Sequence, residues 1–236
     1  MLRIFLAVVY HTLLFGTFLT AWSLPAQPAR DLTLEYRKTE KGIYSAVLRN
    51  RHATAATAYI AQASYRLQGK QQPTAFGGDS MAYPSGGYAL PPGSSNDTGN
   101  SLPPEAEPLT TGIMAAIYAD GFTEGDPSVV QMLLSGRHRS LLDLPRAIQF
   151  LDQAASGKLD SASVMKEFEG MRNRDSAEAK QLDEMISVPG VRHGIFMTAV
   201  PSYALAMLQA ARPPETLSAE CRKWLETLRD SKPPVR

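Results

Sequence analysis

The hydrophobic pattern of the chain changes its period once, at Asp126, and this change constrains the fold more than any other feature. Before it, apolar and polar residues alternate, as over residues 32–36, which is typical of a half-buried strand. After it, apolar residues recur every three or four positions, as over residues 141–151, which is typical of an amphipathic helix. The sequence therefore predicts an α+β protein in which the strands precede the helices.

The first part of the chain reads as a series of short strands with turn residues between them. A hairpin is predicted over residues 32–48, with its turn at Gly42, and further strands over 57–67 and 111–118. The segment that contains Pro73 and Gly77 is predicted to be a loop. The stretch 82–108, which is rich in Pro, Gly and Ser, is predicted to be a long loop, either mobile or a loose connection across a sheet. We expect residues 31–125 to form an antiparallel β-sandwich of the immunoglobulin-like kind.

The second part, residues 126–230, is predicted to be entirely helical. Asp126 is expected to cap the first helix, which Gly136 would end, and Pro145 would lie in the first turns of a second. Four more helices are expected, with their main apolar residues near positions 164–171, 182–186, 200–211 and 217–228. In the last of these, Cys221 falls on the apolar face, so we expect a buried thiol.

The N-terminus has the pattern of an export signal. One positive charge at Arg3 precedes an apolar run over residues 4–22, and the small residues Ala21 and Ser23 follow two positions apart. This pattern predicts a secretory signal peptide over residues 1–23 and an exported protein, either periplasmic or secreted. The alternative is an uncleaved N-terminal membrane anchor, because the run approaches the length of about 20 residues that spans a bilayer.

Composition narrows the classes of partner. The chain has 24 Lys and Arg residues and 23 Asp and Glu residues. Arg3 is the only one of these in residues 1–23, so the numbers of basic and acidic residues are equal once that segment is removed. An even balance argues against nucleic acid, whose binders cluster positive charge. A single cysteine excludes a disulfide within the chain, a cysteine-based zinc site and an iron–sulfur cluster. We predict no cofactor, and a protein or other cell-envelope component as partner, with membrane contact only if the N-terminal segment is retained.

Three carboxylates lie close together at the boundary between the two parts of the chain. Asp120, Glu124 and Asp126 could supply oxygen ligands to calcium, or form a hydrolytic site together with His138. The spacing does not match an EF-hand loop, and ordinary structural roles explain the same residues: a turn at Asp120 and a helix cap at Asp126. We favour the structural interpretation, so no catalytic or metal-binding residue is assigned. His138 is expected in a solvated linker between helices.

The tripeptide Gly78-Asp79-Ser80 is similar to the nucleophile block of one esterase family. That family also needs an Asp-x-x-His element, which this chain lacks, and a serine without a base to take its proton is a poor nucleophile. We interpret the tripeptide as part of a loop.

The hairpin at 31–50 and the block at 113–126 resemble those of exported bacterial proteins of unknown function that join a small sandwich to helices. The resemblance implies a fold and an exported location, and no activity. The leading hypothesis is an exported, non-enzymatic binding or structural module. The alternatives are a hydrolase with its acidic site at the junction of sandwich and helices, and a membrane-tethered accessory protein.

Overall fold

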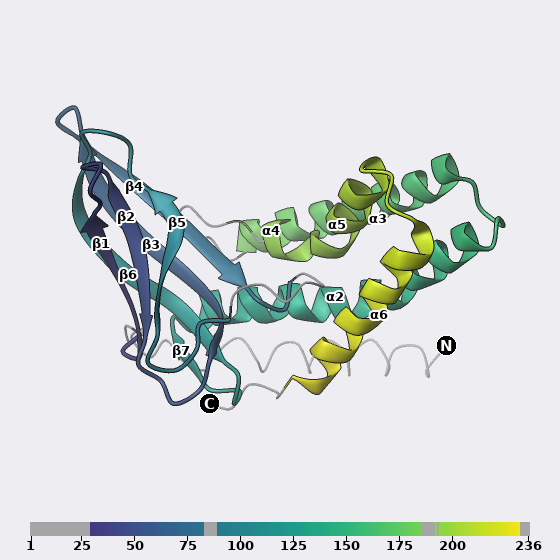
Figure 1. The fold of residues 1–236 in the computed structure, drawn as a ribbon, viewed down its shortest axis with the longest axis horizontal. Helices are drawn as coiled ribbons and strands as arrows, with labels where there is room; N and C mark the ends of the chain where they lie inside the picture. Colours follow the sequence, from purple (N-terminus) through teal and green to yellow (C-terminus); the bar gives the residue numbers. More distant parts are fainter. Residues whose placement is uncertain (1–28, 83–88, 186–191, 193, 232–236) are drawn as a thin grey trace, which may run out of the picture.

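The computed structural model describes residues 29–82, 89–185, 192 and 194–231, and the predicted leader lies outside them. The α+β prediction is confirmed: two antiparallel sheets come first, and helices make up the C-terminal half. In Figure 1 the sheets stand at one end of the molecule, and the helices extend away from one of them. No helix within the described residues is both long enough and apolar enough to cross a membrane.

Sheet A has three strands in the order β1-β2-β5: β1 (Leu32–Lys38), β2 (Tyr44–Asn50) and β5 (Ser95–Ser101). The hairpin of β1 and β2 is confirmed, and Gly42 adopts the positive φ of 77° that its turn needs. The prediction of one long loop over 82–108 is wrong for β5, and residues 83–88 of that stretch lie outside the described residues. β5 has no apolar alternation because nearly all of its side chains are exposed.

Sheet B has four strands in the order β4-β3-β6-β7: β4 (Lys70–Asp79), β3 (Ala56–Leu67), β6 (Glu107–Tyr118) and β7 (Thr123–Gly125). The loop predicted around Pro73 and Gly77 is in fact the edge strand β4. Proline is tolerated there because an edge strand leaves one side of its backbone unpaired. Gly77 is required by packing, since a Cβ at this position would lie 2.6 Å from the carbonyl oxygen of Tyr59.

The two sheets pack face to face around an apolar core. Sheet A contributes the alternate residues that the sequence pattern marked as buried, and sheet B contributes residues of β3 and β6. The buried members of this core are Leu32, Leu34, Ala46, Leu48, Ala56, Ala61, Leu90, Ile113, Ala116 and Tyr118.

The opposite face of sheet B carries the helical half through α2 (Pro127–Ala155). Val129, Met132 and Leu133 of α2 pack on alternate residues of β3 and β6. The predicted break at Gly136 is wrong, because α2 continues through both Gly136 and Pro145. A Cβ on Gly136 would lie 2.5 Å from the Cβ of Phe196, so this glycine permits close helix packing and does not end a helix.

The other helices complete a second core on α2. They are α3 (Ser161–Met185), α4 (Gly194–Met197), α5 (Ala199–Gln209) and α6 (Pro214–Asp230). The two helices predicted around 164–171 and 182–186 form the single helix α3 within the described residues. Cys221 is buried in this core, as predicted, beside Trp224. Burial raises the pKa of the Cys221 thiol to about 12, so at neutral pH it is an uncharged core side chain.

Candidate functional site

The β6–β7 hairpin brings two of the predicted acidic residues, Asp120 and Glu124, to one end of the sheets. The backbone N–H of Gly121 donates to the carbonyl oxygen of Tyr118 at 3.0 Å, and Gly121 has a φ of 90°. The N–H of Phe122 donates to Oδ1 of Asp120 at 3.0 Å, which leaves Oδ2 free to point at a neighbour. This turn positions the Asp120 carboxylate.

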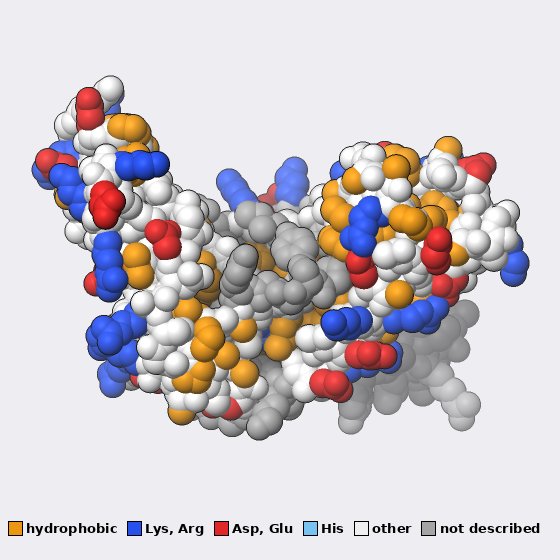
Figure 2. All heavy atoms as spheres, in the orientation of Figure 1, with side chains coloured by type: hydrophobic (Ala, Val, Ile, Leu, Met, Phe, Trp, Pro, Cys, Tyr) orange, Lys and Arg blue, Asp and Glu red, His pale blue; other side chains and the backbone are white. Residues whose placement is uncertain are grey.

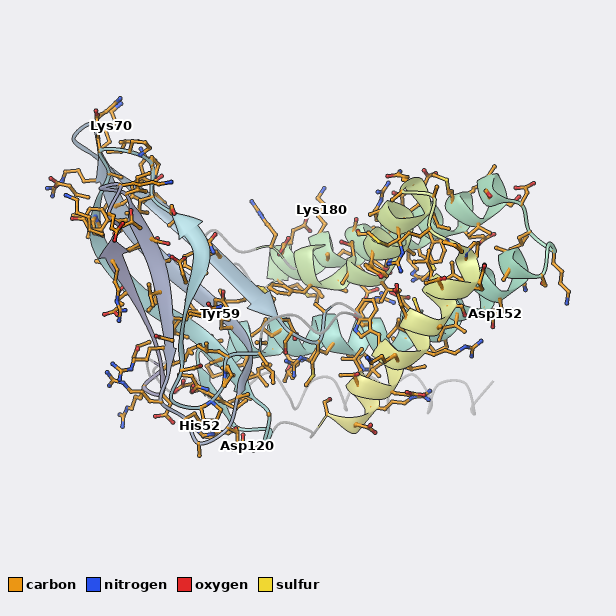
Figure 3. The ribbon with its side chains drawn as sticks, viewed as in Figure 1. His52, Tyr59, Lys70, Asp120, Asp152 and Lys180 are labelled. Atoms are coloured by element: carbon orange, nitrogen blue, oxygen red, sulfur yellow. The ribbon has the colours of Figure 1, made fainter. Side chains whose placement is uncertain are left out.

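His52 lies between two carboxylates. Its Nδ1 is 3.0 Å from Oδ2 of Asp31, and its Nε2 is 3.0 Å from Oδ2 of Asp120. An ionised carboxylate only accepts hydrogen bonds, so both contacts are hydrogen bonds when each ring nitrogen carries a proton, that is, in the imidazolium form. Figure 3 shows His52 and Asp120 together at one end of the sheets, opposite the end that carries Lys70.

Two aromatic rings pack against His52 and keep its side chain only 15% exposed. The ring of Tyr118 is 4.1 Å away between centroids, and the ring of Phe122 is stacked on it at 5.0 Å. An imidazolium over aromatic faces is attracted by their quadrupoles. Partial burial alone would lower the pKa of His52, but its hydrogen bonds to Asp31 and Asp120 raise it above the ordinary value.

Glu124 attaches the start of β1 to β7. Its Oε2 accepts the backbone N–H groups of Arg30 at 2.7 Å and Asp31 at 3.2 Å, and its Oε1 accepts that of Leu32 at 3.0 Å. The hydroxyl of the buried Tyr118 also donates to Oε1 of Glu124. Burial, followed by this hydrogen bond, raises the pKa of Tyr118, so the phenol remains a donor.

Asp31, His52, Tyr118, Asp120 and Glu124 therefore form a cluster that we call the N-terminal latch. It joins β1, the β2–β3 connection and the β6–β7 hairpin through charge-assisted hydrogen bonds. A general base needs a free nitrogen lone pair, and both nitrogens of this ring are engaged. The chemistry of the cluster is that of a structural clasp with a titratable centre.

The structure does not gather the four residues of the hydrolase alternative. Asp126 caps α2, as predicted, with its Oδ1 accepting the N–H of Ser128 at 2.7 Å. The expectation of a linker at His138 is wrong, because this exposed residue lies in the middle of α2. His138 lies twelve positions after Asp126, or about 18 Å along the helix axis.

Sequence reasoning missed His52, Asp31 and Tyr118. The two carboxylates are 21 and 68 residues from His52 along the chain, so no local spacing signals the cluster. Within the described part of the chain, no group of three or more His, Cys, Asp or Glu side chains is placed to hold a metal ion. The Asp120 carboxylate, a calcium candidate, is held by His52, and this hydrogen bond lowers its pKa.

A second feature is an open groove of about 420 Å³ on sheet B, beyond the end that α2 covers. The sheet B groove is lined by residues of β3, β4 and β6 that include Gln62, Ser64, Gln71, Thr110, Gly112 and Met114. Its lining among the described residues contains no charged side chain. Figure 2 shows the molecule hollowed between the far end of the sheets and the helical half.

Polar side chains form a ladder across the three strands of the sheet B groove. Ser64 and Thr110 are joined through their hydroxyl oxygens at 2.7 Å, and Nε2 of Gln71 donates to the hydroxyl of Ser64 at 3.3 Å. Gly112 lies beside them, paired with Gln62 in regular register. The groove is therefore a flat, uncharged, amide- and hydroxyl-bearing surface.

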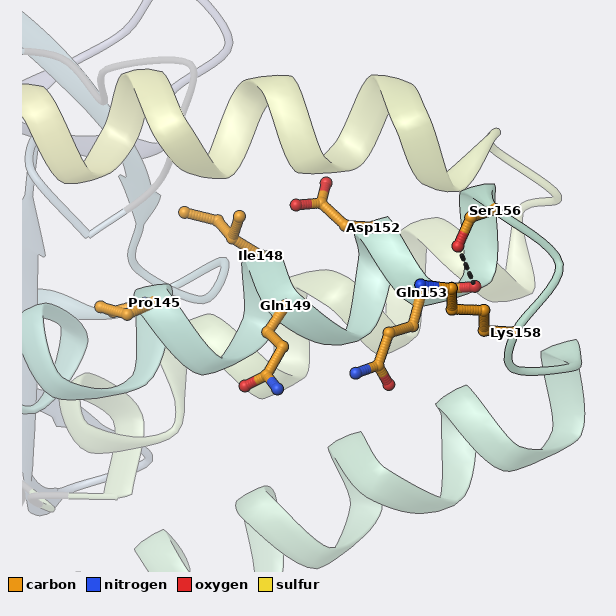
Figure 4. Close-up of a pocket in the computed structure, with 7 residues that line it drawn as sticks. All are labelled: Pro145, Ile148, Gln149, Asp152, Gln153, Ser156 and Lys158. Carbon is orange, nitrogen blue, oxygen red and sulfur yellow. Dashed lines mark hydrogen bonds between the residues drawn. The ribbon is translucent and has the colours of Figure 1, made fainter.

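Another groove, of about 390 Å³, runs along the C-terminal half of α2 (Figure 4). Its one acidic residue among the described side chains is Asp152, which accepts hydrogen bonds from Ser218 at 2.6 Å and from Arg222 of α6. These bonds lower the pKa of Asp152. Asp152 thus ties α2 to α6 and is not a free ligand group.

Comparison of the chain with protein families, with curated proteins and with solved structures gives no match.

Proposed function

We propose that the protein is an exported, non-enzymatic binding module with an immunoglobulin-like sandwich, and that it binds an extended segment of a cell-envelope protein in the sheet B groove. Gly112 is the observation that carries this proposal. It stands in the middle of β6, where glycine weakens a strand, and glycine there often marks a bulge or the close approach of another backbone.

Neither the local backbone nor the packing explains Gly112. Its φ is not positive, and a Cβ built on it meets no atom within 4 Å. The register shift nearest to it falls after Gly112, between the partners of Ile60 and Ala61. Gly77 of β4, by contrast, is required by the carbonyl of Tyr59. Because neither the fold nor the backbone conformation requires glycine at this exposed position, Gly112 supports close contact with the backbone of a second polypeptide.

The chemistry of the lining favours a polypeptide partner. Amide and hydroxyl groups such as Gln62, Gln71 and Thr110 pair with main-chain groups of any sequence, and Met114 adapts to different side chains. The uncharged lining favours a segment without a cluster of charges. The groove also continues the sheet face on which α2 packs, so rigid strands hold it.

The test uses a bulky side chain at Gly112. Gly112→Trp places an indole ring in the groove, and the new Cβ meets no atom within 4 Å. Gly170→Trp on α3 is the matched control, since that glycine is also exposed and free of neighbours. Both variants and the wild type are used as bait against the exported fraction, and bound proteins are quantified by mass spectrometry.

We expect a set of proteins that the wild type and Gly170→Trp retain equally and that Gly112→Trp retains at least about tenfold less. Equal retention by all three baits would refute the sheet B groove as the binding site. Loss of retention by both variants would show a fold defect, which thermal unfolding of each variant measures separately.

A further inference from the structure

The helices α2 and α3 are joined by a buried cluster of charged side chains. Asp143 of α2 is 4% exposed and Asp175 of α3 is fully buried. Nη2 of Arg174 donates to Oδ1 of Asp143 at 2.7 Å and to Oδ1 of Asp175 at 2.9 Å. Nε of Arg139 lies 3.5 Å from Oδ1 of Asp175, and Arg139 also pairs with Glu178.

The charges of this cluster do not balance when every acid is ionised. Three carboxylates, Asp143, Asp175 and Glu178, face two guanidinium groups, Arg139 and Arg174. The Oδ2 atoms of Asp143 and Asp175 are both buried, and no donor among the described residues reaches them. An unpaired buried carboxylate oxygen is costly, and one proton held in a hydrogen bond between the two carboxyl groups would balance the charge of the cluster.

We propose that Asp143 and Asp175 share one proton, and that this proton holds α3 against α2, so that the helix pair is tight in acid and loosens when the proton is lost. The inference concerns the helical half and does not depend on the function of the sheet B groove.

The titration of Asp143 falls in the neutral range. Burial, and after it the charge and hydrogen bond of Asp175, raise the pKa of Asp143 from 3.8 to about 7, although Arg174 and Arg139 act in the opposite direction. A raised carboxyl pKa means that the folded state holds the proton more firmly than the unfolded chain. The stabilisation is therefore complete in acid and is lost as the pH rises through about 7.

Other elements packed on these helices bring few charges to the pair. α4 has no ionisable side chain, and the one on α5, Tyr203, donates to Glu220 of α6. On the α6 side of α2, Asp152 and Arg222 pair with each other nine residues beyond Asp143. On the sheet side, Arg137 pairs with Asp79 of β4.

Loosening of α3 from α2 would widen a groove of about 420 Å³ that lies beside Asp143 and Asp175, between α2, α3 and α4. Arg139 and Glu178 of the cluster line this groove together with Leu134, His138, Leu142, Leu182 and Met197. Loss of the proton would separate its two walls and expose their apolar side chains. Protonation of the Asp143–Asp175 pair would thus control how widely this groove between α2 and α3 opens.

Hydrogen exchange of the full chain at about pH 5.5 and about pH 8.5, corrected for intrinsic rates, tests the proposal. We expect α3 amides to lose protection by about tenfold or more at the higher pH in the wild type. Asp143→Asn, whose amide remains a donor to Asp175, should make that protection independent of pH. Asp152→Asn is the control on the same helix, and it should keep the wild-type pH response.

Equal protection of α3 at both pH values in the wild type would overturn the proposal, and so would a pH response retained by Asp143→Asn. If Asp143→Asn does not fold, the carbon chemical shift of the Asp143 carboxyl in the wild type decides. A midpoint near 7 supports the shared proton, and a midpoint near the ordinary aspartate value of 3.8 overturns it.

Discussion

Removal of the Arg137 guanidinium tests how the helical half is held on sheet B. The Nε and Nη2 of Arg137 donate to the two carboxylate oxygens of Asp79, at 2.8 and 3.0 Å, and Nη2 also donates to the hydroxyl of Thr57 at 3.0 Å. The Asp79 side chain is 3% exposed and Arg137 is 11% exposed. The acid of the Gly-Asp-Ser tripeptide is therefore the anchor for α2.

Arg137→Met keeps the aliphatic part of the side chain and removes the charge, which leaves Asp79 buried without its partner. Breaking a buried pair in this way costs about 3–5 kcal/mol of unfolding free energy. Protonation of an ordinary aspartate at pH 7 costs about 4 kcal/mol, so uptake of a proton limits the loss. We expect a loss of about 3–4 kcal/mol at pH 7 and a smaller loss near pH 4, where protonation costs little.

Urea unfolding monitored by circular dichroism, at both pH values, measures the loss. Arg66→Met is the matched control, because Arg66 pairs with Glu107 on the same sheet at 3.6 Å but with side chains 55% and 69% exposed. That exposed pair should contribute less than about 1 kcal/mol. If Arg137→Met is no less stable than Arg66→Met, or if its loss does not shrink in acid, the buried pair is not what docks α2.

Two further predictions concern the N-terminal latch and its hairpin. Gly125→Ala should cost more than about 2 kcal/mol in a thermal unfolding assay, because Gly125 has a φ of 97° and a Cβ there would lie 2.1 Å from the carbonyl oxygen of Met114. Gly93→Ala, at a φ of 68° with open space around it, should cost about 1–2 kcal/mol, and equal losses would contradict the argument from close approach. For His52, the raised pKa means that its stabilisation is present below about pH 6.5 and is lost as the pH rises through the folded-state pKa. The difference in urea midpoint between wild type and His52→Gln should therefore shrink from neutral to alkaline pH, and a constant difference would show that the imidazolium is not the stabilising form.

The sequence predicts those parts of the fold in which local patterning and burial agree. The alternation in β1 and the cap at Asp126 each depend on neighbouring residues, and both predictions are confirmed. β5 could not be predicted in this way, because exposed polar side chains give no alternation and backbone pairing with β2 alone defines the strand.

The wrong helix boundaries have tertiary causes. Glycine often ends a helix, and the sequence therefore suggests a break at Gly136. In the structure, Gly136 lacks the Cβ that would collide with Phe196 of α4, so it allows the two helices to pack closely. Pro145 removes one hydrogen bond from α2, but its neighbours Leu144 and Ala147 are buried in the helical core, and the helix continues. The latch was unpredictable for the same reason, since Asp31, His52 and Asp120 meet only after three separate strand pairings have formed.

One strand face connects the docking of α2 with the proposed binding site. Positions 58, 60, 62 and 64 of β3 share a face, and the first two are apolar and lie under α2, whereas Gln62 and Ser64 line the open groove. A shift of one residue in register would turn Ile60 away from α2, so the docked helix also fixes which side chains the groove presents. Arg137→Met should therefore weaken binding in the groove together with stability, while Gly112→Trp should weaken binding by at least about tenfold without lowering stability. One variant on α2 and one on β6 then separate a defect in the scaffold from a defect in the binding surface.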